Sequence, residues 1–329
     1  MRRWLKIKKE KLYSKSKWLM LGALRGRIGK VIDRMLVPVL FRTNDGTYVL
    51  REKWNNMIIL DACRYDAFER VYEEMGINGK LEYRFSRGAT TSEFLIENFG
   101  KGKFEDIIYI TANPIVSDLL KGNFYKIVPV WKQWWDEKAD TVPPFAVYNS
   151  TLEVLRKYPN KKLIIHFMQP HCPYPNGTGT YRTEKSLFGE VQYCKIDEDH
   201  IVKWKYIRLK PIEVNKLLEG YYANLKLVIP YVKKLVNILP GRIVVTADHG
   251  EAFGEKIHPL LPIKFYSHHA RIRIPTLVKV PWLIVKGKEK IGEREILRLK
   301  IKELKKSGKY NITQKSENVL VGEHNGEKH

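Results

Sequence analysis

IVVTADHGEAFGE, residues 243–255, joins a short apolar run to a charged turn. Ile243–Thr246 are apolar or β-branched, which is typical of a strand buried inside a parallel sheet. Ligands of open α/β sheets collect in the crevice beyond the carboxyl ends of the strands. Asp248 and His249 stand at such an end, and Gly250 permits an unusual backbone turn, so the stretch predicts half of a metal site. A turn with a hydrogen-bonded histidine explains these residues equally well.

Two further apolar runs end in residues that can bind a cation. Met57–Leu60 leads directly into Asp61, and a carboxylate at the end of a buried strand is costly unless it is paired or bound to a cation. This favours Asp61 as a metal ligand over a helix cap. Leu163–Phe167 contains His166, which fits a core histidine, and runs into a stiff proline-rich loop that would present His171 to the same crevice.

A cluster of hydroxyl side chains follows Gly88. Thr90, Thr91 and Ser92 precede an apolar helical pattern that begins at Phe94, so they are expected at a helix N-terminus, where the backbone N–H groups favour an anion. Ordinary N-capping, by Ser92 or Thr91, explains the cluster without any chemistry. A threonine becomes a nucleophile only when a bound cation or base activates its hydroxyl, and these residues by themselves leave both roles open.

Two other candidates lie in polar turns. Arg64 either pairs with Asp66 or reaches a substrate anion with its fork of donors. His268 and His269 are adjacent, so their side chains point in different directions and at most one of them is expected to enter a site.

The pattern along the chain predicts three parts: a basic arm over 1–50, an α/β domain over 51–290, for which the resemblance described below implies a catalytic role, and a helix with a polar tail over 291–329. Strands are expected at 107–111, 127–130 and 276–285. A helix is expected at 215–238, where Pro230 either kinks or splits it, and another at 291–306. Residues 178–210 show no clear period and read as an insertion or lid over the site.

Composition bounds the class of partner. The 329-residue chain carries a formal charge of +23, and residues 1–34 hold twelve Lys or Arg against two acids. Such a charge invites an anionic membrane surface or a phosphate- or sulfate-bearing substrate, whereas nucleic acid is disfavoured because no nucleic-acid-binding motif accompanies it. The three cysteines form no framework of pairs. We therefore expect a cytoplasmic protein, in which residues 1–34 either attach to the membrane surface or form a solvated basic arm that packs a few apolar residues on the domain.

Six motifs in order extend the pattern beyond single residues. They are ILDACRYD (59–66), SRGATTSEF (86–94), IYITANP (108–114), HFMQPHCPYP (166–175), TADHGEAFGE (246–255) and YSHH (266–269). Together they resemble the sulfatase-like branch of the alkaline phosphatase superfamily. The resemblance implies an α/β fold, a three-layer αβα sandwich around a mostly parallel sheet, with a metal site at the carboxyl edge of the sheet.

The resemblance also implies roles for individual residues. Thr91 would be the nucleophile and a metal ligand, with Thr90 as the fallback because the double threonine leaves the register open by one residue. A divalent ion (Mn, Zn, Mg or Ca) would be bound by Thr91 and by three further residues: Asp61, Asp248 and His249. His171 and His268 would contact the substrate oxyanion or the leaving group, or complete a second metal site, for which His166 is another candidate.

One departure from the classical sulfatases affects the substrate. Those enzymes convert a Cys or Ser within a C/S-x-P/A-x-R pattern, whereas here Ser86 is followed by Arg-Gly-Ala-Thr. A threonine nucleophile is instead similar to that of the phosphodiesterases and phosphoglycerol-type transferases of the superfamily. The sequence thus favours phosphoesters over sulfate esters and leaves hydrolysis and transfer both open. The competing hypothesis is a non-catalytic accessory protein that binds an anionic polymer or membrane through its basic arm.

Overall fold

A seven-stranded mixed sheet forms the centre of the molecule. The computed structural model describes residues 44–174, 211–256, 264–268 and 270–306, and five short strands between 183 and 208. Residues 1–43, which include most of the basic arm, lie outside this part, as do much of the 178–210 insertion, His269 and the tail from 307. Predictions that concern those residues stay predictions.

The strand order of the sheet is β2-β14-β11-β1-β5-β3-β4. Five consecutive strands of this order are parallel to one another: β11, β1, β5, β3 and β4. The strand β14 is antiparallel to both β11 and β2. Their bounds are β1 Asn56–Leu60, β2 Lys80–Phe85, β3 Phe104–Thr111, β4 Phe124–Pro129, β5 Lys162–Phe167, β11 Arg242–Thr246 and β14 Lys279–Lys286. The sheet is therefore mostly parallel, as predicted.

Side chains of the central strands alternate between two apolar cores, one on each face of the sheet. In β1, Ile58 and Leu60 enter one core, whereas Met57 and Ile59 enter the other. Successive side chains of a strand point to opposite faces, so an uninterrupted apolar run is what a strand covered on both faces requires. Every residue of β1 is buried, which explains why its sequence was readable as a strand.

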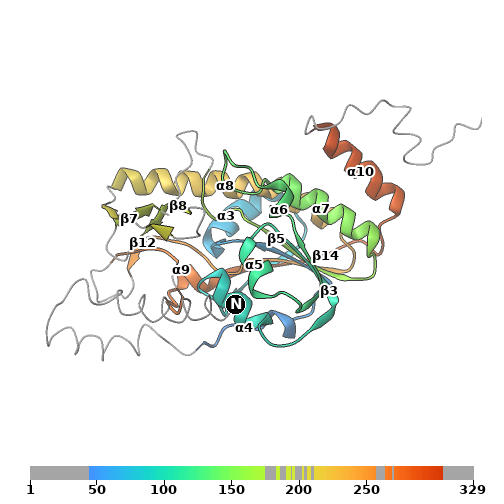
Figure 1. Ribbon diagram of the computed structural model, residues 1–329, viewed down its shortest axis with the longest axis horizontal. Coiled ribbons are helices and arrows are strands. Elements are labelled where there is room, and N and C mark those ends of the chain that lie inside the picture. Colours follow the sequence, from blue (N-terminus) through green and yellow to red (C-terminus); the bar gives the residue numbers. More distant parts are fainter. Residues whose placement is uncertain are drawn as a thin grey trace, which may run out of the picture.

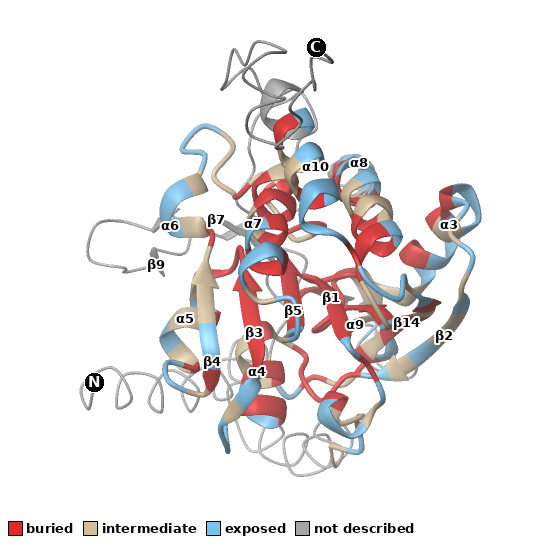
Figure 2. Cartoon of the chain, turned by 90° about the vertical axis from the view of Figure 1, so that its right-hand side faces the viewer, coloured by how far each residue is buried: buried red, intermediate tan, exposed pale blue. Residues whose placement is uncertain are grey.

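Helices cover both faces and complete the three layers (Figures 1 and 2). One face packs against α3 Tyr65–Met75, α7 Pro144–Lys157, α8 Pro211–Ile238 and α10 Glu293–Lys306. The other packs against η1 Val49–Arg51, α4 Thr91–Phe99 and α5 Pro114–Leu119. In Figure 1, α7 and α8 lie above the sheet and α4 lies below it. The architecture is the αβα sandwich that the sequence predicted.

Smaller elements surround the carboxyl edge of the sheet. An antiparallel hairpin of β12 (Ala252–Lys256) and β13 (Lys264–Ser267) follows β11, and the short helix α9 (Pro275–Val278) precedes β14. The predicted insertion contains a three-stranded sheet of β6 (Thr183–Lys185), β7 (Glu190–Tyr193) and β10 (Tyr206–Arg208), together with the pair β8 (Lys195–Ile196) and β9 (Val202–Lys203). The helix α6 spans Trp131–Trp134.

One predicted strand starts later than expected, one of two alternatives for a helix is excluded, and one strand was not predicted. The strand expected at 276–285 begins only at Lys279, because Pro275 opens the helical turn α9. Pro230 does not split the helix at 215–238, which runs continuously as α8. The edge strand β2 was not predicted, since its side chains are largely exposed or half-buried and lack the apolar run of an inner strand.

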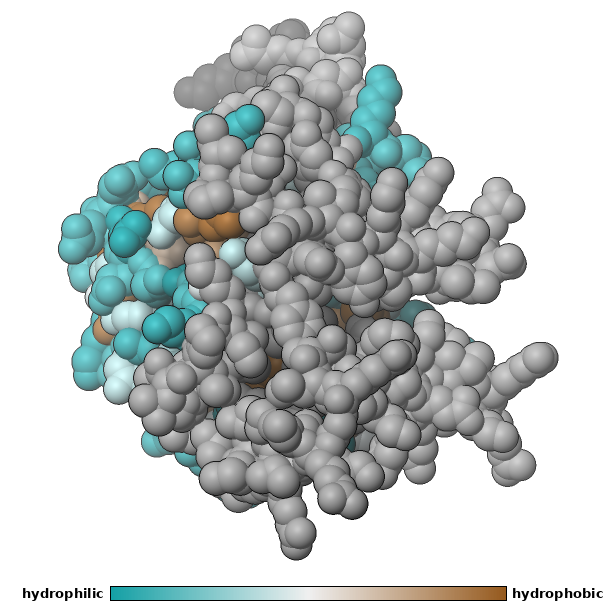
Figure 3. Space-filling view, turned by 90° about the vertical axis from the view of Figure 1, so that its left-hand side faces the viewer, coloured by the Kyte–Doolittle hydropathy of each residue, from teal (hydrophilic) through white to brown (hydrophobic). Residues whose placement is uncertain are grey.

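The described surface in Figure 3 is mostly hydrophilic, with a smaller apolar area. Seven large apolar side chains of the described residues are exposed, among them Tyr83 and Ile96. Within the part of the chain that the structure describes, no helix combines the length and the apolar character needed to cross a bilayer.

Candidate active site and metal centre

The carboxyl ends of two neighbouring parallel strands bring the first predicted ligands together. Asp61 directly follows β1, whereas Asp248 and His249 follow β11, which pairs with β1 in parallel register. All three side chains are fully buried. The pairing of the strands places these residues side by side although 186 residues separate the loops that hold them.

The spacing of the ligand atoms fits a bound divalent cation. Nε2 of His249 lies 3.6 Å from Oδ1 of Asp61 and 3.6 Å from Oδ2 of Asp248. Two atoms that bind one tetrahedral ion at about 2.1 Å are roughly 3.4 Å apart. Nδ1 of His249 donates to the Gly250 carbonyl at 2.8 Å, so Nε2 keeps its lone pair. Oδ1 of Asp61 is buried and has no hydrogen-bond partner among the described residues. A cation would satisfy it.

The hydroxyl of Thr91 points at the same cluster. Its Oγ1 lies 2.7 Å from Oδ2 of Asp248, 3.5 Å from Oδ2 of Asp61 and 3.3 Å from Nε2 of His249. Thr91 is the first residue of α4 and is almost fully buried, with 6% of its surface exposed. The Thr91 hydroxyl oxygen therefore lies both at the N-terminus of α4 and beside the candidate cation ligands.

Thr90 has a different position. It is the N-cap of α4, and its Oγ1 accepts the Glu93 N–H at 3.3 Å. The carboxylate of Glu93 in turn accepts the Ala89 N–H at 2.9 Å, which fixes the turn that precedes the helix. Thr90 therefore caps the helix, whereas Thr91 contacts the carboxylates. The sequence had suggested Ser92 or Thr91 as the cap.

Backbone groups hold Asp248 in place. Its Oδ1 accepts the N–H groups of Ala62 at 3.1 Å and of His249 at 2.9 Å. Ala62 adopts a left-handed conformation with φ of 60°, which turns its N–H toward this carboxylate. Burial would raise the pKa of Asp248, but electrostatic attraction by the neighbouring His249 and His166 rings and the hydrogen bonds that it accepts lower the pKa overall. The carboxylate is therefore the stable form.

Gly250 is needed for space rather than for an unusual φ. A Cβ on this residue would lie 2.0 Å from the backbone oxygen of Thr276. The Gly250 N–H also donates to the Leu277 carbonyl at 2.8 Å, which ties the loop after β11 to α9. The sequence identified this glycine correctly but for a different reason.

A second cluster of possible ligands adjoins the first. Nitrogen and oxygen atoms of His171, Glu251 and His268 lie within 4.8 Å of one another. Glu251 is almost fully buried and accepts a hydrogen bond from Nδ1 of His268 at 3.0 Å. The rings of His268 and His249 are 4.4 Å apart between centroids, so this cluster borders the Asp-Asp-His centre. The sequence had left Glu251 without a role.

The two histidines of the second cluster differ in electrostatics. Burial would lower the pKa of His171, but the nearby Cys172 and the Asp61 carboxylate raise it overall. Burial lowers the pKa of His268, and the attraction of Glu251 only partly offsets this effect. Nδ1 of His171 donates to the Cys172 carbonyl at 2.5 Å, which leaves its Nε2 available.

A family model described as Sulfatase matches residues 103–296, more than half of the chain. The chain belongs to the sulfatase family. The matched segment includes the residues from His171 to His268, whereas Asp61 and Thr91 precede it. No curated protein matches this family member.

Several solved structures resemble this sulfatase-family chain at low identity. The integral membrane lipooligosaccharide phosphoethanolamine transferase A from Neisseria meningitidis is 14% identical at a TM-score of 0.42, over 75% of this chain and 50% of that one. The C-terminal periplasmic domain of EcEptC from Escherichia coli, in complex with Zn, is 16% identical at 0.44, over 77% and 78%. The chain thus spans half the length of the first protein.

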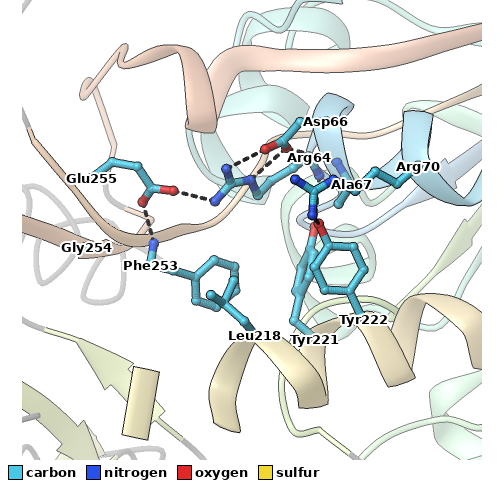
Figure 4. A pocket seen from close by; sticks show the side chains of 10 residues that line it. All are labelled: Arg64, Asp66, Ala67, Arg70, Leu218, Tyr221, Tyr222, Phe253, Gly254 and Glu255. Carbon is cyan, nitrogen blue, oxygen red and sulfur yellow. Dashed lines mark hydrogen bonds and ion pairs between the residues drawn. The ribbon is translucent and has the colours of Figure 1, made fainter. Parts of the chain in front are cut away.

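The guanidinium of Arg64 lies in the wall of a neighbouring pocket. This pocket of about 360 Å³ is lined by α3, α8 and the β12 hairpin (Figure 4). Arg64 pairs with both oxygens of Asp66 at 2.7 and 2.9 Å and with Glu255 at 2.5 Å. Burial would lower its pKa, but these carboxylates raise it overall. The predicted pairing with Asp66 is thus present, and substrate contact stays a prediction.

Two polar residues at the ends of β3 and β5 lie beside Asp61, and the sequence analysis assigned neither of them to this centre. Asn113, the N-cap of α5, donates its amide N–H to Oδ2 of Asp61 at 2.6 Å. His166, interpreted as a core histidine, is buried with Nε2 3.7 Å from the same oxygen. A signal for both was present, since each polar residue stands at the carboxyl end of an apolar strand of the predicted sheet.

Proposed function

We propose that the chain is a metal-dependent hydrolase or transferase that cleaves phosphate or sulfate esters through a covalent intermediate on Thr91. The observation that carries the proposal is the position of Thr91 Oγ1, 2.7 Å from Asp248 and 3.3 Å from His249 at the start of a helix. Membership of the sulfatase family supports the same class of reaction.

Four residues would hold one divalent cation: Asp61, Thr91, Asp248 and His249. Two carboxylates, an imidazole and a hydroxyl suit Zn²⁺ or Mn²⁺, and Mg²⁺ or Ca²⁺ is less suited because the imidazole nitrogen is a softer donor. When bound, the ion would lower the pKa of the attacking hydroxyl and withdraw charge from the ester. Asp248 accepts the hydrogen bond of the Thr91 hydroxyl and so receives its proton as the oxygen attacks.

The reaction has two displacements. In the first, Thr91 Oγ1 forms a bond to phosphorus or sulfur while the bond to the leaving alcohol breaks. In the second, water or an acceptor alcohol attacks the Thr91 ester and releases Oγ1. The N-terminal N–H groups of α4 favour an anion at this position. A phosphoester is the preferred substrate because no sulfatase-type modification pattern surrounds the threonine.

His171 and His268 would serve the side of the site that faces the leaving group. Nδ1 of each ring is held by a hydrogen-bond acceptor, so Nε2 of each is available for the non-bridging or leaving-group oxygens. Together with Glu251 they are alternatively the ligands of a second metal ion, since their donor atoms fall within 4.8 Å.

The test is an assay of the purified full chain with an aryl phosphodiester, an aryl phosphomonoester and an aryl sulfate, each with added Mn²⁺ or Zn²⁺. We expect turnover that a chelator abolishes and that metal restores. Intact-mass measurement after rapid quenching should find one phosphoryl or sulfuryl group, and peptide mapping should place it on Thr91. Turnover that survives both Thr91→Ala and Thr90→Ala excludes the covalent mechanism.

The basic arm suggests where the enzyme would act. Its twelve Lys or Arg residues within 1–34 would hold the enzyme at an anionic membrane surface, close to a lipid-linked or polymeric ester. Removal of residues 1–34 should abolish salt-dependent binding to anionic vesicles while turnover of a small aryl ester persists. Full vesicle binding by the shortened chain would contradict this placement.

A further inference from the structure

His166 has an environment that a core histidine does not explain. It lies near the end of β5, which pairs with β1 on one side and β3 on the other, in the middle of the sheet. The side chain is fully buried, and its Nε2 has no hydrogen-bond partner among the described residues. A buried polar atom without a partner is disfavoured, so the Nε2 atom in this position requires a polar partner or an ion.

The atoms that Nε2 of His166 faces are carboxylate oxygens. It lies 3.7 Å from Oδ2 of Asp61 and 3.8 Å from Oδ2 of Asp248. Both separations are too long for a hydrogen bond. They are close to the spacing of two atoms that share one ion, and they match the two 3.6 Å separations of His249 from the same carboxylates.

Tyr109 supplies the support that a metal-binding histidine usually has. Its hydroxyl oxygen lies 3.0 Å from Nδ1 of His166, and both residues are fully buried. A ligating imidazole binds through one nitrogen and donates the N–H of the other to an acceptor, which fixes the ring. Nδ1 would donate to the Tyr109 oxygen here, and Nε2 would keep its lone pair toward the carboxylates. His249 has the same arrangement with the Gly250 carbonyl.

We propose that His166 is a further ligand of the metal ion, through Nε2, and that Tyr109 is the residue that positions it. The inference rests on the proposed metal centre and adds a strand to it: ligands then come from the ends of β1, β5 and β11, three adjacent strands of the sheet. A purely structural histidine in the core would instead leave metal affinity unchanged when replaced.

The experiment measures metal affinity rather than turnover. The full chain is freed of metal by dialysis against a chelator and titrated with Zn²⁺ and with Mn²⁺ in competition with a chromophoric chelator. Variants are His166→Ala, Tyr109→Phe and the control Ile165→Val, which changes the neighbouring core residue of the same strand. We expect Tyr109→Phe to lower affinity by roughly 10–100-fold and His166→Ala by at least as much, while Ile165→Val stays at the wild-type value.

The absorption spectrum of bound Co²⁺ distinguishes loss of a metal ligand from general destabilisation of the fold. Co²⁺ bound to the wild type should show a d–d absorption spectrum that changes in band position for His166→Ala and not for Ile165→Val. His166→Gln replaces the alanine variant if the latter does not fold. A wild type that binds metal while both His166 variants keep its affinity and its Co²⁺ spectrum overturns this inference alone. A wild type that binds no metal overturns the proposed centre itself.

Discussion

The adjacent threonines permit a test in which two similar substitutions both lower stability but only one of them, at Thr91, should remove catalysis. Thr90→Ala removes the oxygen that accepts the Glu93 N–H and leaves the cluster of carboxylates untouched. Thr91→Ala removes the oxygen that lies 2.7 Å from Asp248 and leaves the cap intact. The two variants delete the same atoms one residue apart, so each serves as the control of the other.

The structure sets the size of both effects. Loss of an N-cap oxygen costs about 1 kcal/mol, which lowers the melting temperature by roughly 2–4 °C in a domain of this size. Thr91→Ala leaves the buried Oδ2 of Asp248 without its hydroxyl partner and costs about 1–3 kcal/mol. Removal of a nucleophile lowers turnover on the order of 10⁴–10⁶-fold, so Thr91→Ala should be inactive at measurable levels. Thr90→Ala should retain most of the activity.

Initial rates with an aryl phosphodiester and Mn²⁺ or Zn²⁺, paired with calorimetric melting of each variant, provide the measurement. Rates are compared at a temperature at which all three proteins are fully folded. The reasoning fails if Thr91→Ala retains activity within about tenfold of the wild type. It fails equally if Thr90→Ala loses as much activity as Thr91→Ala while the melting temperature is unchanged.

Three other outcomes are expected. Metal at about 100 times its Kd should stabilise the wild type by roughly 2.7 kcal/mol in thermal melts, and Asp248→Asn should lose this response; equal stabilisation of both proteins would contradict the assignment. Gly250→Ala should cost about 1–3 kcal/mol and impair metal binding because its Cβ meets the Thr276 carbonyl, whereas Gly292→Ala, with open space around the Cβ, should be tolerated in the same melts. The pKa of Asp66 is lowered because its hydrogen bonds and pairing with Arg64 outweigh burial, so its stabilisation is present above the unfolded value of 3.8 and is lost as pH falls through the folded value. In Asp66→Asn, the stability measured by circular dichroism should therefore fall less steeply below about pH 4 than in the wild type. Acid unfolding of the two proteins with the same pH dependence would refute this.

The inner strands were predictable because their environment is uniform. Residues of β1, β5 and β11 are covered on both faces, so nearly every position must be apolar and the run stands out in the sequence. The edge strand β2, KLEYRF, has no buried residue and no such constraint. Burial on both faces is therefore what made this part of the fold readable, and its absence explains what was missed.

The proximity of the first candidate ligands was predictable for a related reason. Acids and histidines at the ends of apolar strands must meet once the strands are parallel neighbours, so the sequence alone predicts that Asp61 and Asp248 lie close together. His166 was interpreted as a core histidine or as a candidate for a second metal site, and only the structure, with β5 beside β1 and Nε2 3.7 Å from Oδ2 of Asp61, shows that it faces these carboxylates. Helix periodicity likewise could not decide between Thr90 and Thr91, since the choice depends on where α4 begins.

The location of the cluster links stability to function. Asp61 and Asp248 lie at the centre of the sheet, fully buried, where the effective dielectric constant is low and charges interact strongly. Two carboxylates in such a place repel each other and lose their hydration, and Oδ1 of Asp61 has no hydrogen-bond partner among the described residues. The arrangement is favourable when histidines and a cation balance the charge. The electrostatics that would activate Thr91 would therefore also make metal binding a contribution to the stability of the folded chain.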